Sequence, residues 1–209
     1  MTSSPREIPR IAVQATAGGL LLMAFFTTLW ASWSMAGLPL AAGIVVIVVF
    51  LLFAVLFVIA GIRLFAVARR FPTVDTTSRR AQTRSMGRRF GIIFGIEGVL
   101  IGVASGVLGA VGLSDYINPA IALIVGLHFI PLARTFERTI DYWVAAWVVA
   151  AALIGIALLA FTTLAATVVW TVVALATACG TSAYGFYMIR EGRRLTGIAD
   201  AAPGPADAG

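Results

Sequence analysis

Residues 39–62 read PLAAGIVVIVVFLLFAVLFVIAGI, an apolar run of about two dozen residues that contains no charged side chain. A helix needs about 20 mostly apolar residues to cross the hydrocarbon core of a bilayer, because each residue advances it by only about 1.5 Å. The run therefore predicts a membrane-spanning helix. Runs of this kind recur along the chain, and the predicted spans lie at about 11–35, 39–68, 90–113, 118–134, 142–162 and 166–189.

The composition of the whole chain agrees with this interpretation. Of the 209 residues, 60% are hydrophobic and 11% are charged, and the mean hydropathy is +0.99. Soluble domains carry about 25% charged residues, so this chain has too little polar surface for a soluble fold. We expect an all-α polytopic transmembrane helical bundle of six spans within residues 1–194. The tail 195–209 lacks large apolar residues, and we expect it to be disordered and cytoplasmic.

The positions of the arginines predict the orientation of the bundle. The net charge is +6, and every basic residue is an arginine. Connections on one side of the predicted bundle carry arginine and those on the other side carry none, which is the pattern of cytoplasmic and external loops. We therefore expect a multi-pass protein of the cell (inner) membrane with both termini in the cytoplasm. Because topology accounts for the charge, we expect the lipid bilayer as a partner and no nucleic acid.

Glycine recurs at steps of three and four in the third predicted span. Such spacing places the glycines on one ridge of a helix, where a neighbouring backbone can approach closely. We therefore interpret the ridge as a structural packing surface and expect the third span to lie centrally, packed on two sides. The ridge consists of Gly91, Gly95, Gly98, Gly102, Gly106 and Gly109.

Two ionisable residues lie deep in consecutive predicted spans. Glu97 is eight residues beyond Arg89, about 12 Å into the third span, and His128 is six residues before Arg134, about 9 Å into the fourth. A carboxylate in hydrocarbon costs at least about 2.5 kcal/mol, so such residues face a bundle interior and find partners. Glu97 and His128 could share one proton as a relay, could form a hydrogen-bonded pair that only fixes the helix register, or could make no contact at all.

Three further residues complete the candidate site. Pro131 removes a backbone hydrogen bond and should kink the fourth span beside His128. Arg63 and Tyr187 enter through a spacing shared by three predicted hairpins, in which a polar residue follows a glycine by two positions and an arginine follows it by eight. If this spacing reflects a true repeat, Arg63, His128 and Tyr187 lie at one depth around a pseudo-threefold axis. The three sets are Gly61, Arg63 and Arg69; Gly126, His128 and Arg134; and Gly185, Tyr187 and Arg193.

Residues 126–133 (GLHFIPLA) and residues 95–98 (GIEG) carry a resemblance to a family. They resemble segments of small bacterial six-span integral membrane proteins to which no activity is assigned. The resemblance covers about the middle quarter of the chain. It implies a bacterial inner membrane and favours Glu97 and His128 as a matched pair, but it implies no activity.

Several chemistries are disfavoured by what the chain lacks. With one histidine and one cysteine it offers neither a bis-histidine haem site nor three or four zinc ligands, so we expect no cofactor, no metal and no enzymatic activity. Our leading hypothesis is a small proton-linked transporter or permeation protein for a proton or a small molecule. The alternative is a non-catalytic membrane scaffold, a partner subunit or a stress-response membrane protein.

Overall fold

The computed structural model describes residues 8–73 and 77–201, with the backbone alone over 77–83. Within these residues the chain forms helices and short connections, without a strand. The prediction of an all-α six-span bundle is confirmed, because the described part holds six helices long and apolar enough to cross a membrane. They are α1 (Arg10–Trp33), α2 (Leu40–Ala68), α3 (Thr77–Ala110), α4 (Ile117–Phe136), α5 (Thr139–Phe161) and α6 (Ala166–Asp200), with short 3-10 helices η1 (Ser34–Gly37) and η2 (Ser114–Tyr116) after α1 and before α4.

Several helix boundaries coincide with signals in the sequence. Pro9 and Pro39 directly precede α1 and α2, where a residue with a fixed φ and no N–H to donate is tolerated. At the other end of a helix, α4 stops at Glu137, whose φ of 54° is the left-handed conformation that often follows a helix. The observed α1, α2, α4 and α5 therefore match their predicted spans to within about one turn.

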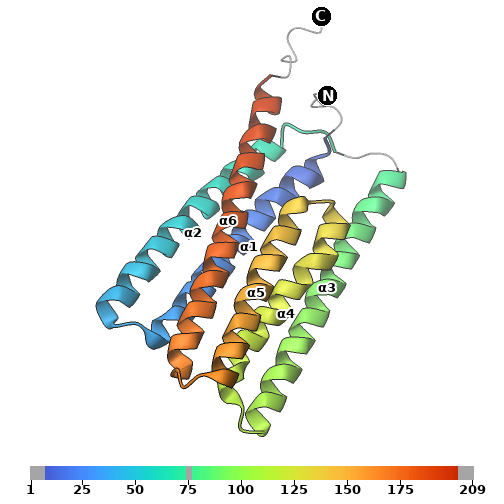
Figure 1. Ribbon diagram of the computed structural model, residues 1–209. Coiled ribbons are helices and arrows are strands. Elements are labelled where there is room, and N and C mark those ends of the chain that lie inside the picture. The colour runs from blue at the N-terminus through green and yellow to red at the C-terminus, as the bar shows by residue number, and fades with distance from the viewer. Residues whose placement is uncertain (1–7, 74–76, 202–209) are drawn as a thin grey trace, which may run out of the picture.

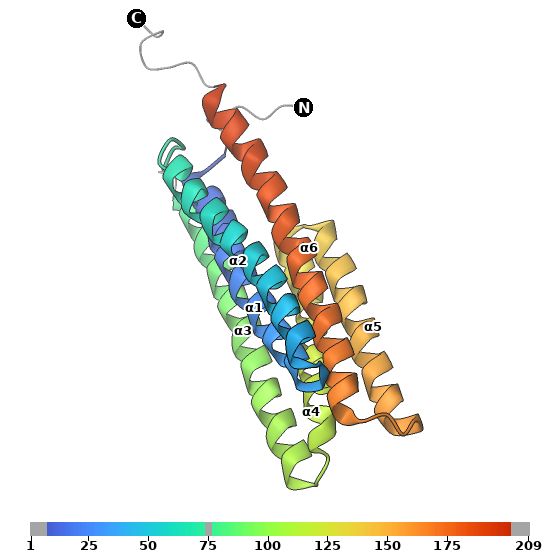
Figure 2. The ribbon, with the colours of Figure 1, turned by 90° about the vertical axis from the view of Figure 1, so that its left-hand side faces the viewer.

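The helices form three antiparallel hairpins, α1–α2, α3–α4 and α5–α6. Helix α6 joins them, because it packs against α1, α2, α4 and α5. Figure 1 shows α2 and α3 at opposite edges of the bundle, and Figure 2 shows α6 running beside the other helices and projecting beyond them at one end. Helices α1, α3 and α5 begin, and α2, α4 and α6 end, at the same end of the bundle (Figure 1). Since the arginine-bearing connections lie there, we call it the arginine-rich end.

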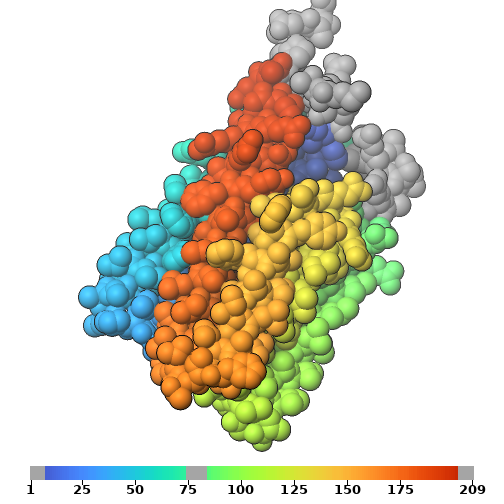
Figure 3. Space-filling model, in the orientation of Figure 1, coloured from blue at the N-terminus to red at the C-terminus, as the bar shows by residue number. Residues whose placement is uncertain are grey.

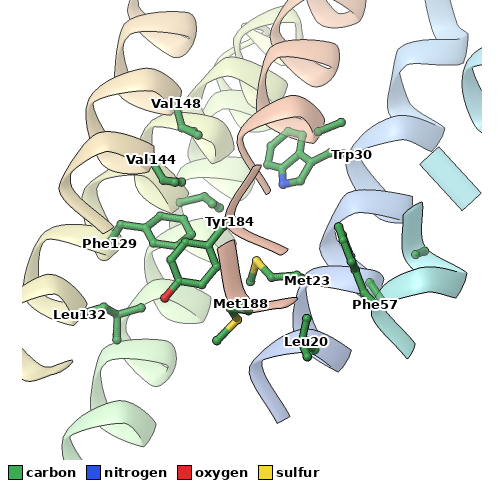
Figure 4. Packing of buried hydrophobic residues seen from close by; sticks show 14 of the residues in the cluster. Leu20, Met23, Trp30, Phe57, Phe129, Leu132, Val144, Val148, Tyr184 and Met188 are labelled. Carbon is green, nitrogen blue, oxygen red and sulfur yellow. The ribbon is translucent and has the colours of Figure 1, made fainter. Parts of the chain in front are cut away.

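The core between the hairpins combines aromatic, aliphatic and hydroxyl side chains. Figure 4 shows the Phe129 and Tyr184 rings on the α4–α5 side and Phe57 on the opposite side. Buried hydroxyls are paired across helices: Thr27 donates to Thr181 over 3.0 Å, and Thr171 donates to the Ser34 carbonyl over 3.0 Å. Such pairing is what an apolar membrane interior requires, because no water is present there to satisfy a polar group.

The expectation that the third span is central is wrong. Helix α3 lies at an edge of the bundle (Figure 3) and packs mainly against α4. Only 6% of its apolar window is buried, compared with 50% for α6. Helix α6 is the central helix instead. Its hydropathy alone predicts neither its full length nor the packing of several of its faces.

The glycine ridge of α3 does not pack within the described chain. A Cβ added at Gly95, Gly98, Gly102 or Gly106 would meet no described atom within 4 Å. The physical reason is the rotation of the helix. Burying Glu97 against α4 avoids the cost of a carboxylate in lipid, and this turns the glycine ridge outward. The side chains that accompany Glu97 on the packed face are Ile93, Phe94 and Ile101.

Two helices extend beyond their predicted spans at the arginine-rich end. Helix α6 continues to Asp200, so the first six residues of the predicted disordered tail are helical; residues 202–209 lie outside the described residues. The cause is an apolar face at helical spacing, on which Gly192 approaches Leu64 of α2 and Leu195 is 7% exposed. Helix α3 likewise begins at Thr77, well before the predicted span at 90.

The three glycines of the proposed repeat all lie at helix contacts, but not at equivalent ones. Gly61 packs against α1 within its own hairpin, at the Ala17 carbonyl. Gly126 packs against Val149 of α5, and Gly185 packs against Phe57 of α2, both in other hairpins. The repeat therefore stays a prediction. Packing explains why each of the three positions requires a residue without a side chain.

Arg10 has a structural role besides its place in the charge pattern. Its Nη2 donates to the Arg69 carbonyl over 2.9 Å and its Nε donates to the Phe71 carbonyl over 3.3 Å. These carbonyls lie at and beyond the end of α2, where a helix leaves acceptors without partners. Arg10 thus ties the start of α1 to the end of α2.

We expect Arg10→Ala to lower the free energy of unfolding by about 1 kcal/mol, since the bonds are charge-assisted but partly exposed. Arg10→Lys should recover only part of the loss, because lysine lacks the planar fork. Thermal unfolding in one detergent measures both, with exposed Arg193→Ala as the control. Equal melting temperatures for all four proteins would contradict the capping role.

Candidate functional site

The structure brings Glu97 of α3 and His128 of α4 together. The distance between His128 Nδ1 and Glu97 Oε1 is 3.3 Å, and the two side chains are 8% and 6% exposed. This is ion-pair distance, but Nδ1 is not aligned for a hydrogen bond with a described partner. The pair lies in the contact surface between α3 and α4, where each helix presents one ionisable group to the other. Either residue alone would leave a buried polar group without a partner.

Aromatic rings enclose the pair. The His128 imidazole packs at 5.3 Å from the Phe94 ring and at 4.4 Å from the Phe129 ring, measured between centroids. Phe90 stacks on Phe94 one turn nearer the arginine-rich end, at 4.5 Å. Both side chains of the pair are buried beside these rings, and in such a low-dielectric setting the charge on one group strongly affects the other.

Pro131 lies one turn beyond His128 in α4. The helix runs through it without a break in its helical backbone. Pro131 has no N–H, and its own carbonyl accepts a hydrogen bond from the Thr135 hydroxyl over 2.8 Å. The predicted kink beside His128 stays a prediction.

Arg63 and Tyr187, the other two candidates, do not join the pair. Arg63 is exposed on α2, the edge helix opposite α3 (Figure 1). Tyr187 is 38% exposed on α6, and its ring lies 6.3 Å from that of Tyr184. The structure therefore leaves Arg63 and Tyr187 outside the Glu97–His128 pair, and the arrangement of Arg63, His128 and Tyr187 around one axis stays a prediction.

A second ionisable cluster lies near the arginine-rich end and was not predicted. Asp141, in the first turn of α5, is 0% exposed. It is close to the Tyr184 hydroxyl and the Arg138 guanidinium, although neither of its oxygens completes a well-formed hydrogen bond with the described residues. Arg138 donates to the Tyr184 hydroxyl over 3.4 Å.

The sequence did contain a weak signal for this cluster. Asp141 stands three residues after Arg138 and directly before the apolar run of the fifth span, so the predicted span limits place it in the polar connection. An acidic residue in the first turn of a helix is common because it complements the helix dipole. Only the packing of α6 against α5 shows that this side chain is buried.

The described residues do not offer a metal site. No three histidine, cysteine or acidic side chains among them are grouped closely enough to hold an ion. Chemically, the Glu97–His128 pair can bind and pass a proton, or hold a small polar or cationic group between the two side chains.

Six helices of this length and apolarity are those of a multi-pass integral membrane protein, here with a buried carboxyl–imidazole pair between two of them. No family model, curated protein or solved structure matches the chain. The resemblance of residues 126–133 to small bacterial membrane proteins accordingly stays a prediction, and any function has to be argued from the site.

Proposed function

We propose that the protein is a small proton-linked transporter or permeation protein in which His128 relays the transported proton and Glu97 accepts it. One observation carries the proposal: the 3.3 Å contact between two ionisable side chains that are each less than 10% exposed. Ionisable groups within membrane spans are costly, and they commonly mark proton relays or ion paths.

The chemistry follows from the two ring nitrogens of histidine. Nδ1 faces Glu97, so a proton accepted at Nε2 allows the proton on Nδ1 to pass to Glu97 Oε1, after which the imidazole is neutral again. The step needs no other reactant. Glu97 alternates between a carboxylate and a carboxylic acid, and the surrounding Phe94 and Phe129 rings limit the loss of the proton to water.

The alternative is a non-catalytic scaffold or partner subunit, and a specific observation favours it. The glycine ridge of α3 has open space beside it, and small residues on a membrane helix permit close approach of another helix. Beyond Glu97, moreover, the contact between α3 and α4 is made by apolar side chains such as Ile101. A scaffold would use Glu97 and His128 only to hold α3 in register.

Proton flux in proteoliposomes under an imposed pH gradient tests the proposal. We expect the native protein to conduct protons and Glu97→Gln to reduce the flux at least tenfold, because glutamine keeps the shape of the side chain but cannot exchange a proton. His128→Gln should also reduce the flux, and Glu137→Gln, which changes an exposed acid directly after α4, should leave it unchanged.

Equal reconstitution of all variants, judged by the amount of folded protein per vesicle, is the necessary control. Native flux that persists in Glu97→Gln would refute the role of Glu97. The lack of flux in the native protein, with and without candidate small cations or amines in the vesicles, would favour the scaffold.

A further inference from the structure

The Asp141 cluster consists of Asp141, Arg138 and Tyr184 and is separate from the Glu97–His128 pair. The carboxyl group of Asp141 is a buried charge that the sequence pattern does not predict. Asp141 is 0% exposed, and both oxygens lack a well-formed hydrogen bond with the described residues. A buried carboxylate without full hydrogen bonding is unfavourable. This geometry therefore does not suit a purely structural role for Asp141.

The surroundings of Asp141 are those of an exchangeable carboxyl group. The charged and titratable groups that act on it are Tyr184 from α6 and Arg138, the residue before α5. Helix α4 also packs against α5 but contributes no such group among the described residues. Arg138 is only half-buried and lies at the arginine-rich end, so the cluster reaches toward the aqueous surface.

The cluster and the pair are separated by one aromatic ring. Phe129 lies 5.9 Å from the Tyr184 ring and 4.4 Å from the His128 ring, measured between centroids. Figure 4 shows Phe129 beside Tyr184 within the core. Phenylalanine can neither bind nor pass a proton, so it divides the polar groups into one set at Asp141 and one at Glu97.

We propose that Asp141 is a second proton-binding site, which loads the Glu97–His128 pair from the arginine-rich end across Phe129. This inference rests on the proposed function. A hydronium ion at the surface gives its proton to an oxygen of Asp141, forming one O–H bond and releasing water. The neutral carboxyl later gives the proton to a water molecule that passes the Phe129 ring and carries it as hydronium to His128 Nε2, and Arg138 again faces a carboxylate. Separation by Phe129 keeps the two sites from forming a continuous leak.

Proton flux under a pH gradient tests the loading step, with Asp141→Asn as the main variant. Asparagine keeps the shape of the side chain but cannot bind or release a proton, and the loss of a charge in the first turn of a helix costs no more than about 1 kcal/mol. We expect Asp141→Asn to reduce flux at least tenfold, Asp141→Glu to restore part of it, and Glu137→Gln to match the native protein. Native-like flux in Asp141→Asn together with lost flux in Glu97→Gln would overturn this inference and leave the proposed function intact.

Infrared spectroscopy provides a readout that requires neither transport activity nor a substitution of Asp141. In native protein carrying ¹³C-labelled aspartate, acidification should produce the carbonyl band of a desolvated carboxylic acid that shifts with the label. Asp141 is the buried aspartate of the described chain, whereas Asp115 and Asp200 are exposed. The band should persist in Glu97→Gln. Its absence would overturn the inference, whether or not the protein conducts protons.

Discussion

Replacing His128 by leucine is expected to lower the free energy of unfolding by about 2 to 4 kcal/mol, because it leaves the Glu97 carboxyl buried without a partner. Glu97→Leu should cost less, since a neutral imidazole among aromatic rings is tolerated more easily. The double variant should lie within about 1 kcal/mol of the native protein, because two apolar side chains of similar volume can fill the same space. Reversible unfolding of the four proteins in one detergent yields the coupling energy.

The exposed pair Glu191 and Arg194 is the matched control for this cycle. Their side chains are 34% and 63% exposed at a separation of 3.5 Å, and exposed pairs contribute little. Glu191→Gln should therefore change stability by no more than about 0.5 kcal/mol. If the effects of Glu97→Leu and His128→Leu are simply additive, the two side chains do not act as a pair, and the proton relay loses its structural basis.

Leucine at Gly126 is expected to destabilise the protein by about 3 kcal/mol or more, while leucine at Gly102 should not. A Cβ at Gly126 would lie 2.9 Å from the backbone nitrogen of Val149, and backbone cannot move aside as a flexible side chain can. At Gly102 the added atoms meet open space, and leucine is the better helix former by up to about 1 kcal/mol. Melting temperatures of purified monomers compare the two variants directly.

The same pair of variants separates the role of the glycine ridge from the fold. A monomer that is destabilised as much by Gly102→Leu as by Gly126→Leu would mean that α3 is not at the edge of the bundle. If Gly102→Leu instead leaves the monomer intact but abolishes a larger assembly seen with the native protein in mild detergent, the ridge is used between chains. That outcome would favour the scaffold hypothesis.

The sequence alone determined the number of spans, most of their limits and the charge pattern that predicts orientation. These features follow from local rules: about 20 apolar residues cross a bilayer, and arginines gather at one set of helix ends. The depths of Glu97 and His128 follow from the same counting at about 1.5 Å per residue. That the two residues belong together was therefore available as a hypothesis before any packing was known.

Only the tertiary structure decided which faces of the helices meet. The glycines of α3 indicated a packed ridge, but burial of Glu97 against His128 rotates them toward lipid. The sequence pattern places Asp141 in a polar connection and Leu195 in a disordered tail, whereas packing around α6 buries both side chains. In an all-apolar span hydropathy varies little around the helix, so the rotation and neighbours of each helix depend on a few polar contacts and close approaches between residues distant in sequence.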